Sequence, residues 1–330
     1  MNAITTALDT WIHQVIPSRD ESWIAEPLAA EASFRQFFRL RAGDNSWIVM
    51  DSPPDKERND QFCHLAAVFQ AARLPVPEII AADHAAGFYL LSDLGERDLE
   101  TAYRDGDTDA ALSAATDALV QLQQVRDPQI VAYTPARFSD ELEIFNDWFL
   151  DHLLDRSLPV AVEPIFDLLV RRTQDQPQCC VHRDYHCRNL LFSRSGQLGI
   201  VDFQDALVGP AAYDLASLLR DCYHEFPETE VARWCRIYLT RREQHTEASY
   251  DSGRFRQDVD YCAVQRQLKA IGIFARLAGR DGKVSHLPHI APLLRRLIRL
   301  CNDYPELAAL GTFLEQLPGQ LPAELQEPGV

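Results

Sequence analysis

Three polar residues in one short segment have the spacing that phosphoryl transfer requires. Asp184 ends the triplet His182-Arg183-Asp184, Asn189 follows after four intervening residues, and Asp202 follows a short hydrophobic run. A phosphoryl group that moves from ATP to an alcohol carries its charge on oxygen, so the protein must orient the alcohol and neutralise charge. We therefore expect Asp184 to be the catalytic base for the attacking hydroxyl, and Asn189 and Asp202 to bind Mg²⁺.

A hairpin would bring the two expected metal ligands together. Residues 190–192 and 198–201 are hydrophobic, and the segment 194–197 between them contains Ser195 and Gly196, which favour a turn. Two antiparallel strands would place Asn189 and Asp202 at the same end of the hairpin. The alternative is a buried hairpin whose polar residues merely cap a strand. Burying such groups without a cation or a partner is costly.

Hydrophobic periodicity divides the chain into a strand-rich part and a helical part. An amphipathic helix that ends near Pro17 opens the chain, and a second helix over 57–73 interrupts the strands. Strands are expected at 34–41, 47–51, 78–82 and 88–92, and later helices at 138–156, 163–173, 213–224, 229–244, 255–279 and 289–302. This order predicts an α+β, bilobal, protein-kinase-like fold. Residues 1–92 would form a small β-rich nucleotide-binding lobe, 92–96 a hinge, and 97–330 a larger helical catalytic and acceptor-binding lobe.

The composition argues against several classes of protein. Of the 330 residues, 49 are acidic and 32 are Lys or Arg, a net charge of −17, so we expect no binding to nucleic acid. No apolar run is long enough to span a bilayer, and the start lacks the basic region of a secretory signal. We expect a cytoplasmic protein without an obligate protein partner. The eight cysteines form no CxxC pair, so zinc is not expected.

Almost the whole chain resembles the aminoglycoside-phosphotransferase-like kinases. Within them, it is most similar to the anomeric kinases that phosphorylate N-acetylmuramate and N-acetylglucosamine in cell-wall recycling. Besides the segment around Asp184, the segments that carry the resemblance are Ala32-Ser33-Phe34-Arg35, Val49-Met50-Asp51-Ser52-Pro53-Pro54, Leu90-Leu91-Ser92-Asp93-Leu94-Gly95, Tyr213-Asp214-Leu215-Ala216, and Gln265-Arg266 with Arg280-Asp281-Gly282-Lys283. The resemblance implies ATP and Mg²⁺ as cofactors. It also implies a small amino sugar as acceptor, converted to its 1-phosphate.

The resemblance also assigns roles to particular residues. The implied ATP-binding residues are Ser33, Phe34 and Arg35 in a loop over the phosphates, and Ser92, Asp93 and Leu94 beside the adenine. His182 and Asp214 would support the catalytic loop. Asp205 either approaches the acceptor or is a structural cap.

The phosphate-binding cation is an open question. Protein kinases place a lysine on the third strand, but here that strand ends at Met50. The charge is expected from Arg35, from Arg39 or from Lys56 beyond the proline pair. Otherwise magnesium neutralises a larger share of the phosphate charge.

A basic stripe on one predicted helix also has two interpretations. Arg266, Lys269, Arg276 and Arg280 fall within one arc at 100° per residue. The stripe is either a solvated face with salt bridges or a substrate-binding surface. In the second case it would meet the lactyl carboxylate of N-acetylmuramate or the phosphate of the product.

Two other functions are consistent with parts of the sequence. An aminoglycoside- or choline-type kinase would suit an acidic protein, although the basic stripe argues against a cationic acceptor. A nucleotide-binding pseudokinase would explain the missing strand lysine, but Asp184, Asn189 and Asp202 are all present.

Overall fold

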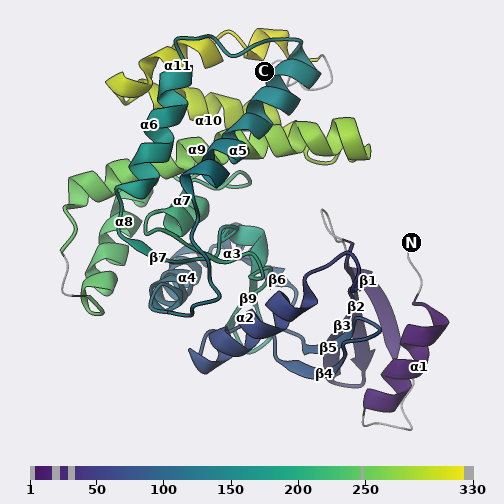
Figure 1. Ribbon diagram of the computed structural model, residues 1–330. Coiled ribbons are helices and arrows are strands. Elements are labelled where there is room, and N and C mark those ends of the chain that lie inside the picture. The colour runs from purple at the N-terminus through teal and green to yellow at the C-terminus, as the bar shows by residue number, and fades with distance from the viewer. Residues whose placement is uncertain (1–3, 17–22, 29–33, 247–248, 323–330) are drawn as a thin grey trace. The chain divides into compact units, whose positions relative to one another are not determined.

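The computed structural model describes residues 4–16, 23–28, 34–246 and 249–322. It contains two compact units (Figure 1). The first contains residues 1–125 and 188–205, and the second contains residues 126–187 and 206–330. These bounds differ from the predicted lobes, because residues 97–125 and the hairpin at 188–205 pack with the N-terminal part. The hinge at 92–96 stays a prediction.

An antiparallel sheet of five strands forms the centre of the first unit, in the order β1-β2-β3-β5-β4. Its strands are β1 (Ile24–Leu28), β2 (Gln36–Ala42), β3 (Asn45–Asp51), β4 (Ile79–Asp83) and β5 (Phe88–Ser92). The four predicted strands are confirmed to within a few residues. Strand β1 was not predicted, because its mostly exposed residues show no apolar alternation. Helix α1 (Thr6–Val15) buries Leu8 and Ile12 against Leu40 and Val49 of the sheet.

The rest of the first unit contains the predicted hairpin. Helices α2 (Asn59–Ala71), α3 (Leu99–Arg104) and α4 (Thr108–Leu122) accompany a small sheet of β6 (Arg97–Asp98), β8 (Leu190–Phe192) and β9 (Leu198–Ile200). Strands β8 and β9 pair as predicted, with Leu190 opposite Ile200. The turn after β5 requires glycine, because Gly95 has φ +106° and a Cβ there would lie 2.2 Å from the Phe192 carbonyl oxygen.

Long helices dominate the second unit (Figure 1). The elements are α5 (Pro135–Ile144), the π-helix η1 (Phe145–Leu153), α6 (Glu163–Gln174), β7 (Gln178–Val181), β10 (Leu207–Pro210), α7 (Tyr213–Leu219), α8 (Glu228–Glu243), α9 (Ser252–Asp281), α10 (Ile290–Asn302) and α11 (Ala308–Leu314), with short 3-10 turns η3 (Leu287–His289), η4 (Pro305–Leu307) and η5 (Pro318–Gln320). A further 3-10 turn, η2 (Cys187–Asn189), contains the last residue of one unit's segment and the first two of the other's. Strands β7 and β10 pair antiparallel. The predicted helix over 138–156 is in part a π-helix, and the one over 213–224 ends at Leu219.

Helix α9 is the central element of the second unit and packs against α5, α6, α7, α8, α10 and η1. Its contact with the junction of α5 and η1 is close: a Cβ at Gly272 would lie 2.5 Å from the Ile144 carbonyl oxygen and 2.6 Å from the Phe145 nitrogen. None of the helices in the described ranges is both long and apolar enough to cross a membrane.

Candidate active site

The catalytic-loop carboxylate, Asp184, follows β7 in the second unit. Its side chain is 38% exposed, so a small acceptor can reach it. The preceding residue, Arg183, has φ +79°, a conformation that non-glycine residues rarely adopt. The Asp184 N–H donates to Nδ1 of the fully buried His182, at 3.3 Å. The strained Arg183 backbone and the hydrogen bond to the buried His182 therefore fix the direction of the Asp184 side chain.

A second carboxylate holds the loop from the first turn of α7. The buried Asp214 accepts the N–H of His182 at 2.6 Å and the N–H of Arg183 at 2.9 Å. These two amides immediately precede Asp184, so Asp214 fixes the strained turn. This contact is the one that the family resemblance implies for Asp214.

A buried glutamate that the sequence did not reveal organises the charges behind the loop. Glu141 on α5 accepts from Arg183 Nη2 at 2.7 Å, pairs with Lys269 Nζ at 3.1 Å, and accepts the Tyr133 hydroxyl. Burial raises the pKa of Glu141. The charges of Lys269 and Arg183 lower the same pKa by a larger amount, so the net shift is downward. No motif marks Glu141. Tyr133 lies only eight residues before Glu141, but Arg183 is 42 residues away and Lys269 lies on α9, so the fold alone brings these charges together.

Two cations of the basic stripe on α9 lie beside Asp184. Arg266 Nη2 is 3.9 Å from Asp184 Oδ1, and Arg266 also donates to the Arg183 carbonyl. Burial raises the pKa of Asp184, but the charges of Lys269 and then Arg266 lower it more, so its pKa lies well below the ordinary value. Asp184 is therefore ionised at neutral pH and accepts hydrogen bonds.

The other two members of the stripe have different environments. Arg280 is exposed and pairs with Asp281 at 2.8 Å. Arg276 is partly buried between Gly272 and Gly279, and both glycines closely approach the segment 144–152. Its Nε is buried without a hydrogen-bond partner among the described residues. Burial, and then the charge of Arg280, lower the pKa of Arg276. A partly buried cation of this kind favours an anionic ligand.

In the first unit, Asn189 and Asp202 meet at the end of the hairpin as predicted. The Val201 N–H donates to the Asn189 carbonyl, and Asn189 Nδ2 lies 3.4 Å from Asp202 Oδ2. Asp202 is exposed, has φ +64°, and accepts from Gln204 Nε2 at 2.7 Å. Amide and carboxylate oxygens are ligands that Mg²⁺ accepts, and it usually keeps several waters and phosphate oxygens as its other ligands. The pair therefore fits magnesium. Within the described ranges, no group of three or more His, Cys, Asp or Glu forms a metal site.

The cations near the sheet are distinguishable by their partners. Arg39 is buried and donates to both carboxylate oxygens of Asp93, at 2.8 and 3.2 Å, and to the Gly95 carbonyl. Burial raises the pKa of Asp93, but Arg39 makes the net shift downward. Arg39 therefore stabilises the turn at 93–95, and its guanidinium donates its hydrogen bonds to that turn.

Arg35 and Lys56 remain as candidates for the phosphate-binding cation. Arg35, the residue before β2, donates to Ser52 Oγ at 3.2 Å and pairs with Glu57, just before α2, at 3.5 Å. Lys56 is exposed and lies over the Phe34 ring. Ser33, the other predicted phosphate contact, lies outside the described residues.

The remaining predicted site residues lie in the first unit. Ser92 ends β5, where its N–H donates to the Glu78 carbonyl, and Leu94 packs over Gly199 of the hairpin. Asp205 is exposed after β9. The acceptor and adenine contacts assigned to these residues stay predictions.

A family model and full-length relatives match this chain. The model described as "Phosphotransferase enzyme family" matches residues 24–254. The N-acetylmuramate/N-acetylglucosamine kinase of Pseudomonas aeruginosa is 37% identical over 337 residues, covering 94% of this chain and 96% of the relative. The protein of the same name from Neisseria meningitidis is 36% identical over 323 residues, covering 94% and 95%.

Solved structures of low sequence identity share the fold. The choline kinase LicA from Streptococcus pneumoniae has a TM-score of 0.65 at 13% identity, covering 91% of this chain and 100% of that chain. The streptomycin–ATP ternary complex of APH(2″)-IIa has a TM-score of 0.58 at 14% identity, covering 89% and 97%. The α+β, protein-kinase-like fold is thus confirmed. With a family model over most of its length and full-length relatives above 30% identity, this chain belongs to the phosphotransferase enzyme family.

Proposed function

We propose that this protein is an ATP-dependent kinase that phosphorylates the anomeric hydroxyl of N-acetylmuramate, N-acetylglucosamine or both, in peptidoglycan recycling. The observation that carries the proposal is the accessible Asp184 carboxylate, ionised by its neighbours Lys269 and Arg266 on a loop braced by Asp214. The names of the relatives that match the chain from end to end support the same activity.

In the proposed reaction, Asp184 accepts the hydrogen bond of the sugar hydroxyl and aligns its oxygen with the γ-phosphorus of ATP. The oxygen–phosphorus bond forms, ADP leaves, and the hydroxyl proton passes to the carboxylate and then to solvent. Because the Asp184 carboxyl has a low pKa, it is a weak base, which suits a transition state with late proton transfer. Magnesium held by Asn189 and Asp202 would neutralise phosphate charge.

Arg35 is the best candidate to replace the strand lysine. It pairs with Glu57 near the start of α2, as the strand lysine of protein kinases pairs with a helix glutamate. Arg39 is engaged with Asp93, so it is not assigned to phosphate. The backbone of Ser92, Asp93 and Leu94 is proposed to meet the adenine.

For the acceptor, we assign the carboxylate of N-acetylmuramate to Arg276. Arg276 lies seven residues after Lys269 on α9, which is about 10 Å along the helix and on nearly the same face. Its side chain is only partly buried, and its Nε has no hydrogen-bond partner among the described residues, so no hydrogen bond of Nε competes with a contact between the guanidinium and a carboxylate. Arg266 and Lys269 are proposed to act beside the reacting groups, and Asp205 is a further candidate acceptor contact.

The two rival functions have less support. An amine acceptor of the choline or aminoglycoside type would meet the cations Arg266 and Lys269 beside Asp184, a repulsive arrangement. A pseudokinase has no need of an ionised, accessible Asp184 together with the Asn189–Asp202 pair.

The product identifies the reaction. Incubation of N-acetylglucosamine with Mg²⁺-ATP should give the 1-phosphate by phosphorus NMR, because the catalytic loop admits one acceptor oxygen in line with the γ-phosphate. The methyl glycoside, whose anomeric oxygen is blocked, should be inert or a competitive ligand. Asp184→Asn should lose nearly all turnover and keep ATP binding. A 6-phosphate product would leave the kinase in place and rule out anomeric transfer.

Arg35 and Lys56 can be separated by kinetics. Arg35→Met should lower kcat/KM for ATP by about 10- to 150-fold, the loss of one charge-assisted contact of about 1.5–3 kcal/mol. Lys56→Met should stay close to the wild type. Thermal unfolding of both variants should show that they are folded. A larger loss for Lys56→Met would transfer the phosphate role to Lys56.

The pH profile tests the charges around Asp184. Lys269 lowers the Asp184 pKa, so Lys269→Met should raise it. The protonated, inactive fraction then grows at acidic pH, and the acid limb of kcat should move to higher pH. Arg280→Met, in the exposed pair with Asp281, is the control and should not move it. Superimposable profiles of Lys269→Met and the wild type would show that Asp184 does not set the acid limb.

Arg276 should determine the preference between the two sugars. Arg276→Gln is expected to reduce kcat/KM for N-acetylmuramate more than for N-acetylglucosamine, by about 1–3 kcal/mol, because only the former carries a carboxylate. Arg280→Gln is the matched control on the same helix. Equal losses for both sugars in folded protein would exclude the carboxylate contact.

A further inference from the structure

Helix α7 has a carboxylate at each end, and both hold the catalytic loop. Asp214, in its first turn, accepts the two amides before Asp184. Asp221, two residues beyond its last residue, accepts the N–H of Cys187 with Oδ2 at 2.9 Å. All seven residues of α7 are buried, so the helix is a fixed support. The loop is thus held on both sides of Asp184.

The Asp221 carboxylate also holds its own loop. Its Oδ1 accepts the Tyr223 N–H at 3.0 Å, so one buried carboxylate joins residues 221–223 to the catalytic loop. The Tyr223 ring contacts the edge of His186, two residues past Asp184, with centroids 5.5 Å apart. A shift of the loop at 221–224 would therefore be transmitted to residues 186 and 187.

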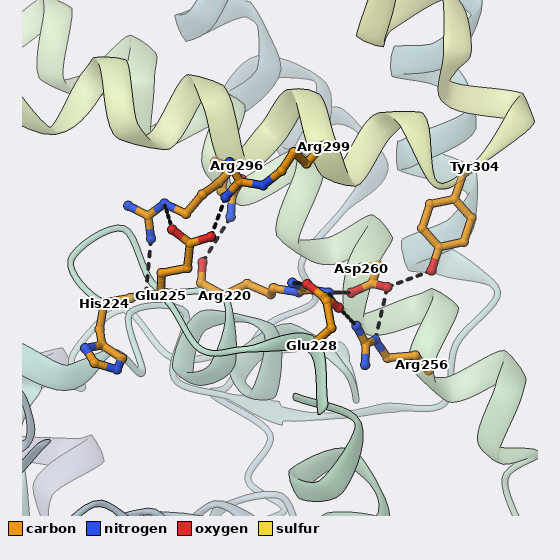
Figure 2. Close-up of polar contacts among 10 residues, drawn as sticks. Arg220, His224, Glu225, Glu228, Arg256, Asp260, Arg296, Arg299 and Tyr304 are labelled. Carbon is orange, nitrogen blue, oxygen red and sulfur yellow. Dashed lines mark hydrogen bonds and ion pairs between the residues drawn. The ribbon is translucent and has the colours of Figure 1, made fainter. Parts of the chain in front are cut away.

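Arg296 on α10 fixes the loop at 221–224 by its backbone. Its Nη1 donates to the His224 carbonyl at 3.1 Å (Figure 2). Nη1 also donates to the Asp221 carbonyl at 2.8 Å, and Nη2 donates to the Cys222 carbonyl at 2.8 Å. The planar guanidinium can serve three carbonyls at once, whereas an ammonium group is a single point with a different geometry.

A cavity of about 410 Å³ borders the same loop. Arg296, His224, Glu225 and Phe226 contribute to its lining. On the side that faces the cavity, the loop at 221–224 therefore has fewer packed side chains against it. The fork of Arg296 therefore supplies positional restraint that packing supplies elsewhere. Arg299, further along α10, pairs with the exposed Glu225 side chain and so provides a comparison on the same helix (Figure 2).

We propose that Arg296 and Asp221 are positioning residues, which transmit the rigidity of α10 through the loop at 221–224 to Cys187 and so keep Asp184 aligned with the acceptor hydroxyl. This inference goes beyond the proposed function and rests on it for its kinetic test. A displacement of about 1 Å at a reacting group can cost about 100-fold in rate, so a remote brace can matter for kcat.

The test compares Arg296→Lys and Asp221→Asn with the control Arg299→Lys. Both positioning variants should lower kcat for N-acetylglucosamine by about 10- to 100-fold and change KM for ATP by less than about twofold. They should also release more ADP per sugar phosphate formed, because a misaligned hydroxyl competes less well with water. Arg299→Lys should remain near the wild type. The double variant should be no slower than the slower single variant, since both act through one loop.

Hydrogen exchange gives a readout that needs no acceptor. The peptide containing the Cys187 amide should exchange faster in Arg296→Lys and Asp221→Asn than in the wild type or Arg299→Lys, without a general rise across the helices. Unchanged exchange there, or a folded Arg296→Lys with kcat within twofold of the wild type, would overturn the proposal. If the wild type phosphorylates no hexosamine, the proposed function fails, and the exchange result still decides whether the brace exists.

Discussion

The proposed catalytic carboxylate, Asp184, is held on a backbone that would not stay in this conformation alone. Arg183, next to Asp184, has φ +79°, and a non-glycine residue in that region costs about 1–2 kcal/mol. The conformation persists because surrounding contacts outweigh that cost. Asp214 accepts two consecutive amides, and Glu141 binds the Arg183 side chain. Helices α5, α7 and α9 thus serve as supports for one short loop.

The contacts that hold this loop also bury several charges in the second unit. An ion pair away from water is costly unless its geometry is good and its remaining hydrogen bonds are satisfied. Glu141 meets that condition with Arg183, Lys269 and Tyr133. The network has a chemical consequence as well, because Lys269 lowers the pKa of Asp184. The same few charges therefore hold the loop and keep Asp184 ionised.

The first unit accommodates the absence of a strand lysine. Met50 is fully buried in the sheet, where a lysine would place its ammonium group in an apolar environment. Arg39 holds the turn at 93–95, and Arg35 lies beside Glu57, just before β2. The proposal that Arg35 takes the place of the strand lysine rests on this arrangement.

The sequence by itself determined the features that depend on neighbours along the chain. The hairpin of β8 and β9 and the pairing of Asn189 with Asp202 follow from local alternation and a turn, because the strands are only a few residues apart. The strands of the sheet and most helices follow from periodicity in the same way. Periodicity indicates which face of an element is buried, but not which residue lies opposite.

The tertiary structure alone decided the partners of the buried charges. Glu141 and Arg296 contact residues 42 and about 75 positions away in the chain, and no local pattern marks either of them. The basic stripe shows the same limit. The sequence placed four cations on one face of a helix, but the packing of α9 directed two of them to Asp184 and Glu141 and left Arg280 in solvent. Long-range packing sets these environments, because an ionic contact depends on what the fold brings within a few ångströms of the charge.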